Sequence, residues 1–284
     1  MSRLSIPKTY KLFIGGKFPR SESGRSFDVT GANGEFLANA AWASRKDARD
    51  AVVAARAAFA GWSGATAYNR GQVLYRVAEI LEGRREQFAA EIVAQEGVSQ
   101  REAEAQVDEA IDLWVWYAGW TDKYAQVAGN ANPVAGPFFN LSVPEPSGVI
   151  AIVAPQNSAL LGLVSVLAPA ILTGNTVVVL ASQAFPLSAI SLAEVLATSD
   201  VPGGVVNVLT GPPAETLPWL ASHADVNGLD LAGAGALDWV DAQIAAAETL
   251  KRVAMPLDGA APASLERVSA FVETKTVWHT KSLI

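Results

Sequence analysis

The feature that most constrains the fold of this chain is a long stretch without charged side chains. No Asp, Glu, Lys or Arg occurs between Glu145 and Glu194. A helix that spans a bilayer needs about 20 consecutive, mainly apolar residues, but the stretch is divided into shorter pieces by Pro155, Gln156, Asn157, Pro169, Gly174, Asn175 and Pro186. We therefore expect a buried strand–helix–strand unit and no membrane span.

The same alternation continues towards the C-terminus. Short runs rich in β-branched residues predict strands at 149–153, 176–180, 205–209, 226–231 and 252–257. Between them, amphipathic runs predict helices at 158–172, 186–199, 214–223 and 237–250. This order predicts an α/β fold with a doubly wound, mostly parallel, Rossmann-like sheet. Both faces of such a sheet are buried, which explains the missing charges.

The N-terminal part of the sequence predicts a mainly helical region. Short strands are expected at 10–16, 26–29 and 36–43, and helices at about 45–59, 69–96 and 99–125. Ser44 followed by Asp47 has the pattern of a capping box at the start of the first helix. The third helix carries an aromatic stripe that we interpret as core packing, formed by Trp114, Trp116, Tyr117 and Trp120.

Two further segments do not belong to this alternation. Residues 126–146 are rich in Gly, Pro and Asn and predict an extended ribbon that projects from the body. Residues 272–278 alternate like a strand but have no neighbouring strand in the sequence. Their pairing partner must therefore lie far back in the chain or in another molecule.

Composition excludes several classes of function. The formal net charge is −7, so the chain lacks the basic surface typical of nucleic-acid binding. It contains no cysteine, which excludes disulfides, thiolate metal sites and thiol nucleophiles. With only His223 and His279, no metal site is expected. The first residues lack the apolar core of a secretory signal, so we expect a cytoplasmic protein.

Several segments follow one another in a familiar order: Leu12–Lys17, Gly148–Asn157, Leu167–Ala170, Gly174–Val177, Val201–Val208 and Glu273–His279. Together they resemble the aldehyde dehydrogenase superfamily from the start of the chain to about Pro262, and again in the tail. The resemblance implies four parts. These are an N-terminal region of strands and helices (1–125), a β-ribbon oligomerisation arm (126–147), a Rossmann-like coenzyme-binding domain (148–262), and a linker with a C-terminal oligomerisation strand (263–284).

The resemblance also implies that the catalytic residues are missing. Members of the family use a Cys nucleophile, a Glu general base and NAD(P) as hydride acceptor, and this chain has no Cys. The family's Leu-Glu-Leu-Gly-Gly motif aligns with Met255–Gly259, which places Pro256 at the general-base position. Asp258, two residues further along the same predicted strand, is expected about 7 Å away from that position. Asn157 matches the family's oxyanion-hole amide, and without a nucleophile we expect it only to hold its turn.

The ribose-binding positions of the family are altered in the same way. Its Lys-Pro-Ser-Glu segment aligns with 180–183, so that Leu180 replaces the Lys and Gln183 replaces the Glu. The Gly-x-Gly after the third strand becomes Gly211-Pro212-Pro213, which removes two backbone N–H donors.

The turn that lies beneath the pyrophosphate in the family aligns with 233–238. Gly233 is kept, Ala234 replaces a hydroxyl side chain, and Asp238 adds a negative charge. No cofactor is therefore expected, and NAD(P) would bind only if backbone amides of this turn still formed an anion site. Outside these motifs, we interpret Asp230 as a hydrogen-bonding group at a strand end, His223 as a residue at a helix C-terminus, and His279 as a surface or interface residue.

The largest departure is a missing domain, because the family's catalytic domain lies between Pro262 and the tail strand, where this chain has only Ala263–Ser269. The first hypothesis is a non-catalytic homologue that serves as a structural or regulatory subunit. It would assemble with a full-length aldehyde dehydrogenase paralogue through the 126–147 arm and the 272–278 strand, adding strands to the partner's catalytic-domain sheet. Such a chain can donate an arm but cannot receive one, which excludes the usual family homodimer. The alternatives are an NAD(P)-dependent aldehyde oxidoreductase by family membership only, a residual nucleotide-binding module, or a gene remnant without a role.

Overall fold

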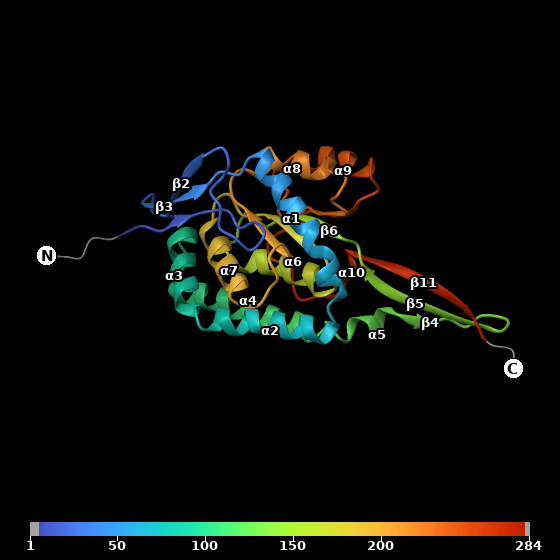
Figure 1. Ribbon diagram of the computed structural model, residues 1–284. Coiled ribbons are helices and arrows are strands. Elements are labelled where there is room, and N and C mark those ends of the chain that lie inside the picture. Colours follow the sequence, from blue (N-terminus) through green and yellow to red (C-terminus); the bar gives the residue numbers. More distant parts are fainter. Residues whose placement is uncertain (1–5, 282–284) are drawn as a thin grey trace.

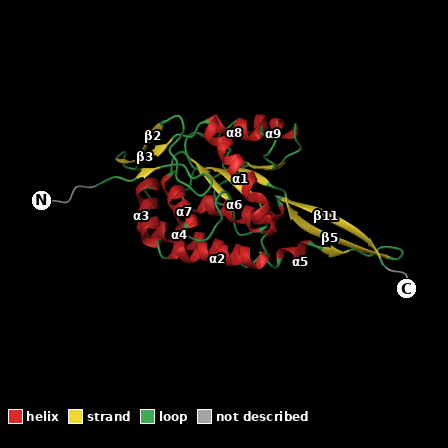
Figure 2. Cartoon of the chain, in the orientation of Figure 1, coloured by secondary structure: helices red, strands yellow, loops and turns green. Residues whose placement is uncertain are grey.

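The computed structural model describes residues 6–281, and a five-stranded parallel sheet lies at its centre (Figures 1 and 2). Its strands are β6 (Val149–Val153), β7 (Thr176–Leu180), β8 (Val206–Leu209), β9 (Gly228–Asp230) and β10 (Arg252–Ala254). They lie in the order β10-β9-β6-β7-β8, and every neighbouring pair is parallel. The predicted doubly wound sheet is therefore confirmed, and its topology reverses between β6 and β9.

Helices cover both faces of this sheet (Figure 1). On one face lie α6 (Leu161–Leu172) and α7 (Leu187–Ala197), with α2 (Ala67–Glu82), α3 (Arg85–Glu96) and α4 (Gln100–Ala118) outside them. The other face is covered by α1 (Arg45–Gly64), α8 (Pro213–Ser222) and α9 (Trp239–Ala247). Successive residues of β6 point to opposite faces, so Ile150 and Ile152 join one apolar core while Val149, Ala151 and Val153 join the other.

The N-terminal region contains a small sheet in the order β1-β3-β2, formed by β1 (Thr9–Tyr10), β2 (Ser26–Thr30) and β3 (Phe36–Ala41). The capping box is confirmed, because the Ser44 hydroxyl accepts from Asp47 N–H and the Ser44 N–H donates to the Asp47 carboxylate at 2.8 Å. Trp114 and Tyr117 are fully buried, so the aromatic stripe is core packing as predicted, although Trp116 and Trp120 are only half-buried.

Three predicted helices are wrong in extent, and the first of them, expected at about 45–59, continues to Gly64. The helix expected at 69–96 is divided at Gly83 and Arg84, because glycine is a weak helix former and the Arg84 backbone leaves the helical conformation, with φ −115° and ψ 14°. The Arg84 guanidinium binds Glu194 of α7 at 2.8 Å. The helix expected to reach Ala125 ends at Ala118, whose carbonyl accepts from the Thr121 hydroxyl at 2.9 Å. A short separate helix, α5 (Tyr124–Ala128), follows.

A three-stranded antiparallel ribbon extends away from the body (Figures 1 and 2), and we call it the arm. It consists of β4 (Asn130–Ala131), β5 (Phe138–Pro146) and β11 (Val272–Thr280), in the order β11-β5-β4. The C-terminal strand thus pairs with a segment far back in the chain, with Thr276 opposite Ser142. The segment interpreted as a linker contains a short helix, α10 (Leu265–Ser269), which was not predicted. No helix within residues 6–281 is long and apolar enough to cross a membrane.

Candidate functional site

The first candidate site is the crevice at the carboxyl ends of the parallel strands, where doubly wound folds bind ligands. The loops after β6 and β7 meet there. Gln156 holds them together, because its side-chain oxygen accepts from Gln183 N–H at 2.9 Å and its backbone carbonyl accepts from the Ser182 hydroxyl at 2.8 Å. Asn157 is exposed, and its side chain forms no hydrogen bond within the described chain. The prediction that Asn157 holds this turn is therefore wrong, and its neighbour does so.

The two ribose-binding positions have different surroundings. Leu180 is the last residue of β7, is 3% exposed and packs in the apolar core on the α1, α8 and α9 face of the sheet. Gln183 is exposed and lines a shallow hollow of about 430 Å³ together with Gln156 and residues 27–30 of β2. Neither side chain presents a charge to the crevice.

The turn after β9 uses its backbone amides internally. The Gly233 N–H donates to the Val153 carbonyl at 2.8 Å, and the Ala234 N–H donates to the Leu231 carbonyl at 2.8 Å. A Cβ at position 233 would lie 1.8 Å from the Ala154 carbonyl oxygen, so this glycine is required by packing alone. The two amides are not free to bind a phosphate.

The helices that begin beside this crevice carry acidic side chains. Helix α8 starts with Pro212 and Pro213, which have no N–H, and has Glu215 in its first turn. Helix α9 has the exposed Asp238 at its N-cap and Asp241 in its first turn. Both aspartates line a cavity of about 220 Å³ between the two helices. Negative charge at a helix N-terminus is favourable for the helix itself but opposes the binding of an anion there.

The general-base position lies outside any strand. Strand β10 ends at Ala254, so the half-buried Pro256 and the exposed Asp258 belong to the loop that follows. The expectation that Asp258 continues the same strand is wrong, since proline removes a ladder hydrogen bond and ends the pairing. This loop and α10 enclose a cavity of about 570 Å³.

A buried ion pair lies beside that cavity. Asp230, at the end of β9, is 1% exposed and accepts from Ala232 N–H at 3.1 Å and from the Arg267 guanidinium of α10. Burial raises the pKa of Asp230 above its usual value, and the positive charge of Arg267 acts in the opposite direction. The interpretation of Asp230 as a hydrogen-bonding group at a strand end is confirmed. Its partner was missed because Arg267 lies in a segment that was interpreted as a linker.

The two histidines lie in different parts of the fold. His223 is the C-cap of α8, and its Nδ1 accepts from Asp225 N–H at 3.1 Å. His279 is exposed on β11 in the arm. They do not form a site together.

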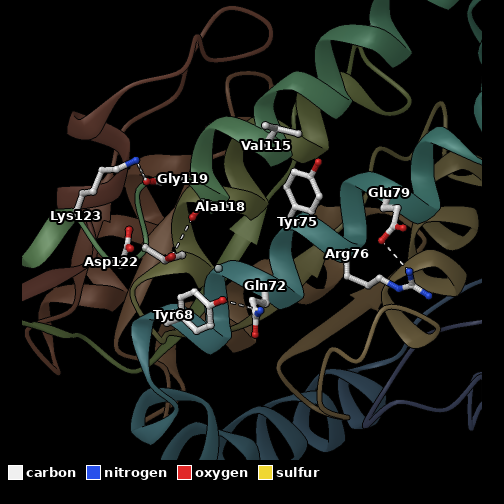
Figure 3. A pocket seen from close by; sticks show the side chains of 12 residues that line it. Tyr68, Gln72, Tyr75, Arg76, Glu79, Val115, Ala118, Gly119, Asp122 and Lys123 are labelled. Atoms are coloured by element: carbon white, nitrogen blue, oxygen red, sulfur yellow. Dashed lines mark hydrogen bonds and ion pairs between the residues drawn. The ribbon is translucent and has the colours of Figure 1, made fainter.

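A second hollow, of about 560 Å³, lies between α2 and α4 in the outer helical layer (Figure 3). Its most exposed apolar side chains are Tyr68, Tyr75 and Val115. The polar side chains around it are paired locally, as Figure 3 shows for Gln72 with the Tyr68 hydroxyl and for Arg76 with Glu79. All of its lining residues belong to 68–79 and 115–123, so no loop from the sheet contributes. Sequence reasoning missed this hollow, for which the only signal is two tyrosines seven residues apart on one helix.

Comparison with known proteins gives a consistent result. Residues 19–268 match the aldehyde dehydrogenase family. The chain is 31% identical over 270 residues to the cytosolic 10-formyltetrahydrofolate dehydrogenase of Mus musculus, with 92% of this chain and 30% of that protein covered. It is 32% identical over 258 residues to the putative aldehyde dehydrogenase DhaS of Bacillus subtilis (strain 168), with 89% and 51% covered.

The similar solved structures agree with the sequence matches. An NAD-dependent aldehyde dehydrogenase from Sinorhizobium meliloti has a TM-score of 0.82 at 28% identity, covering 89% of this chain and 51% of that one. A betaine aldehyde dehydrogenase from Staphylococcus aureus in complex with NAD+ has a TM-score of 0.81 at 26% identity, covering 88% and 50%. The chain thus spans about half the length of these structures, and less than a third of the mouse protein.

Proposed function

The chain belongs to the aldehyde dehydrogenase family, and from this premise we propose that it is a non-catalytic member that assembles with a full-length aldehyde dehydrogenase. Its role is structural or regulatory, and its partner supplies the chemistry. The proposal includes the division into an N-terminal region (1–125), an oligomerisation arm (126–147), a degenerate coenzyme-binding domain (148–262) and a C-terminal part (263–284), and a cytoplasmic location.

The lack of catalytic groups supports this proposal. The chain has no cysteine to act as the family's nucleophile. At the position that we align with the general base stands Pro256, which cannot accept a proton. The nearest carboxylate along the chain, Asp258, is exposed in a loop. The catalytic domain of the family has no counterpart between Pro262 and β11, where the chain forms only α10.

The single observation that carries the proposal is the free edge of the arm. Strand β11 is nine residues long and, in the described part of the chain, pairs only with β5. Soluble proteins usually protect such edges with charged side chains, prolines or bulges. Here the two charged side chains next to the edge are already paired, Lys275 with Glu145 at 3.0 Å and Glu273 with Arg252. An edge of this kind is suited to accept a strand from another protein.

Affinity purification of the tagged chain from its native cell tests the proposed assembly. We expect a full-length aldehyde dehydrogenase to copurify in a fixed ratio, because the free edge of β11 can pair with only one strand of a partner at a time. A Thr274→Pro variant, which removes one N–H donor from the edge, should retain at most about a tenth of that partner, a loss of roughly 1.4 kcal/mol. A Thr274→Ala variant should retain it fully. Purification that never captures a full-length family member would contradict the proposal.

A second candidate function is nucleotide binding, favoured by the cavity between α8 and α9 at the carboxyl ends of the strands. Because Leu180 is buried, the Gly233 and Ala234 amides are occupied and Asp238 and Asp241 line the cavity, we expect no binding of NAD, NADP or ATP tighter than about 1 mM. Isothermal titration calorimetry measures this directly, with an NAD-binding full-length relative as the positive control. Micromolar affinity for any of the three nucleotides would favour the nucleotide-binding function.

A further inference from the structure

A small hollow in the N-terminal sheet is lined by three cationic side chains, and we call it the basic hollow. Its volume is about 230 Å³, and the cations are Lys11, Arg20 and Arg25. Among the described residues, no carboxylate side chain lines it, although the chain as a whole has a formal net charge of −7. The hollow lies at the end of the molecule away from the arm (Figure 1), so it is separate from the edge assigned to the proposed partner.

The strand order places cations on two sides of a small floor. Strands β1, β3 and β2 lie side by side in that order, and Ser26 at the start of β2 is paired with Ala41 at the end of β3. Lys11 directly follows β1, whose last residue is paired with the residue before Ala41. Neighbouring strands are about 4.8 Å apart, so the backbones at Lys11 and Ser26 are roughly 10 Å apart. Ala41, which also lines the hollow, lies between them.

The other two cations flank a tight turn. Arg20 precedes residues 21–24 and Arg25 follows them, and the Ser21 hydroxyl ties the turn to the buried Asp47 carboxylate at 2.7 Å. The backbone N–H groups of residues 22–25 all donate within the turn or to Asp47. Phosphate sites usually rely on free backbone N–H groups of a loop or helix start, and these four are occupied. Recognition in the basic hollow must therefore come from side chains.

The cationic side chains are available to a ligand. Within residues 6–281, Lys11 and Arg20 form no ion pair. Arg25 is held in place, because its guanidinium lies 5.1 Å from the centroid of the Trp42 ring and donates to Glu215 at 3.2 Å. A guanidinium has five N–H donors, so Arg25 keeps donors for a ligand.

From these features we propose that the basic hollow binds a small organic dianion with two separated carboxylates. An arginine fork matches the two oxygens of a carboxylate. With cations on both sides of Ala41, each end of a dicarboxylate is neutralised, whereas a monocarboxylate satisfies only one side. The acidic residue on the same face of the sheet, Asp28, lies two residues beyond Ser26 on β2, about 7 Å away, and does not line the hollow. This site is independent of the proposed function.

Isothermal titration calorimetry of the full chain with succinate tests the proposal. At low ionic strength, we expect a Kd below about 1 mM. Acetate and inorganic phosphate, at the same ionic strength, should bind about tenfold more weakly, because neither spans the floor and each loses charge-assisted hydrogen bonds on one side. Equal binding of the three anions would show only a general attraction to positive charge and would overturn the proposal, as would an absence of succinate binding.

Single substitutions test the location of the site. Lys11→Gln and Arg20→Gln should each weaken succinate binding by about tenfold, and Arg20→Lys, which keeps the charge but loses the fork, should weaken it less. Thermal unfolding checks that the fold is kept. Lys17→Gln is the matched control, because Lys17 is exposed and does not line the hollow, and it should bind like the wild type. An equal loss in all three glutamine variants, or no loss at positions 11 and 20, would exclude this site.

Discussion

Replacing Arg267 by alanine is expected to lower the free energy of unfolding by about 3–5 kcal/mol at neutral pH. The side chain of Arg267 is 12% exposed and that of Asp230 is 1% exposed, so the substitution leaves a buried carboxylate without a counter-charge. It also removes the ion pair that binds α10 to the end of β9. Urea unfolding followed by circular dichroism measures the loss.

The loss in free energy of unfolding of the Arg267→Ala variant should depend on pH and should increase as the pH rises. A carboxyl group whose pKa is raised in the folded state binds a proton more readily there than in the unfolded chain, so stability falls as the pH rises above the usual aspartate value of about 3.9. Removing the Arg267 charge raises the pKa of Asp230 further. The deficit of the variant should therefore be smaller at pH 5 than at pH 7. An equal deficit at both values would contradict the assignment of the effect to this carboxylate.

Arg252→Ala is the matched control for this experiment. Arg252 also binds an acidic side chain, Glu273, but the two side chains are 41% and 55% exposed. Exposed ion pairs contribute about 0–1 kcal/mol. We therefore expect Arg252→Ala to cost less than about 1 kcal/mol. If both variants lost the same amount, burial of the Asp230–Arg267 pair would not be the cause.

The sheet could be predicted from the sequence because its strands are buried on both faces. Runs such as Val149–Val153 and Thr176–Leu180 are buried at every position, and proline, glycine or asparagine lies close to each. An unbroken apolar run does not show where a strand ends, because the end is set by the last backbone hydrogen bond to the neighbouring strand. Thus β10 stops at Ala254, although the apolar pattern continues to Leu257.

The parts that were mispredicted depend on contacts between distant segments. Helix α10 is only five residues long and is held by the pairing of Arg267 with Asp230, which no local pattern contains. At the break between α2 and α3, the Arg84 guanidinium binds Glu194 of α7, a contact that no local pattern contains either. In the candidate site, the altered residue types could be identified from the resemblance. The role of Gln156 as the group that holds the crevice loops could not be predicted. Gln156 and Asn157 are adjacent and carry the same side-chain amide, and only the fold shows which of them contacts the neighbouring loop.

The retained glycine of the turn after β9 shows how a structural requirement can resemble a functional one. In the sequence, Gly233 aligns with a glycine of a phosphate-binding turn, which favours a residual nucleotide site. In the structure, a Cβ there would lie 1.8 Å from the Ala154 oxygen and 2.8 Å from the Pro155 nitrogen, both backbone atoms just after the end of β6. Because the loop passes so close to the end of β6, only glycine fits at position 233, whether or not a nucleotide binds.

Gly233→Ala is therefore expected to lower the free energy of unfolding by about 3 kcal/mol or more, the upper part of the range for overpacking. Relief would require the backbone at Ala154 to shift, which would disturb the end of β6. Gly235→Ala is the matched control in the same turn, because a Cβ added there would have nothing within 4 Å. It should be neutral or stabilise by about 0.4–1 kcal/mol through the unfolded state. Thermal unfolding of both variants measures the difference. If Gly233→Ala were as stable as Gly235→Ala, packing could not account for the glycine, and retention for binding a ligand would be the better explanation.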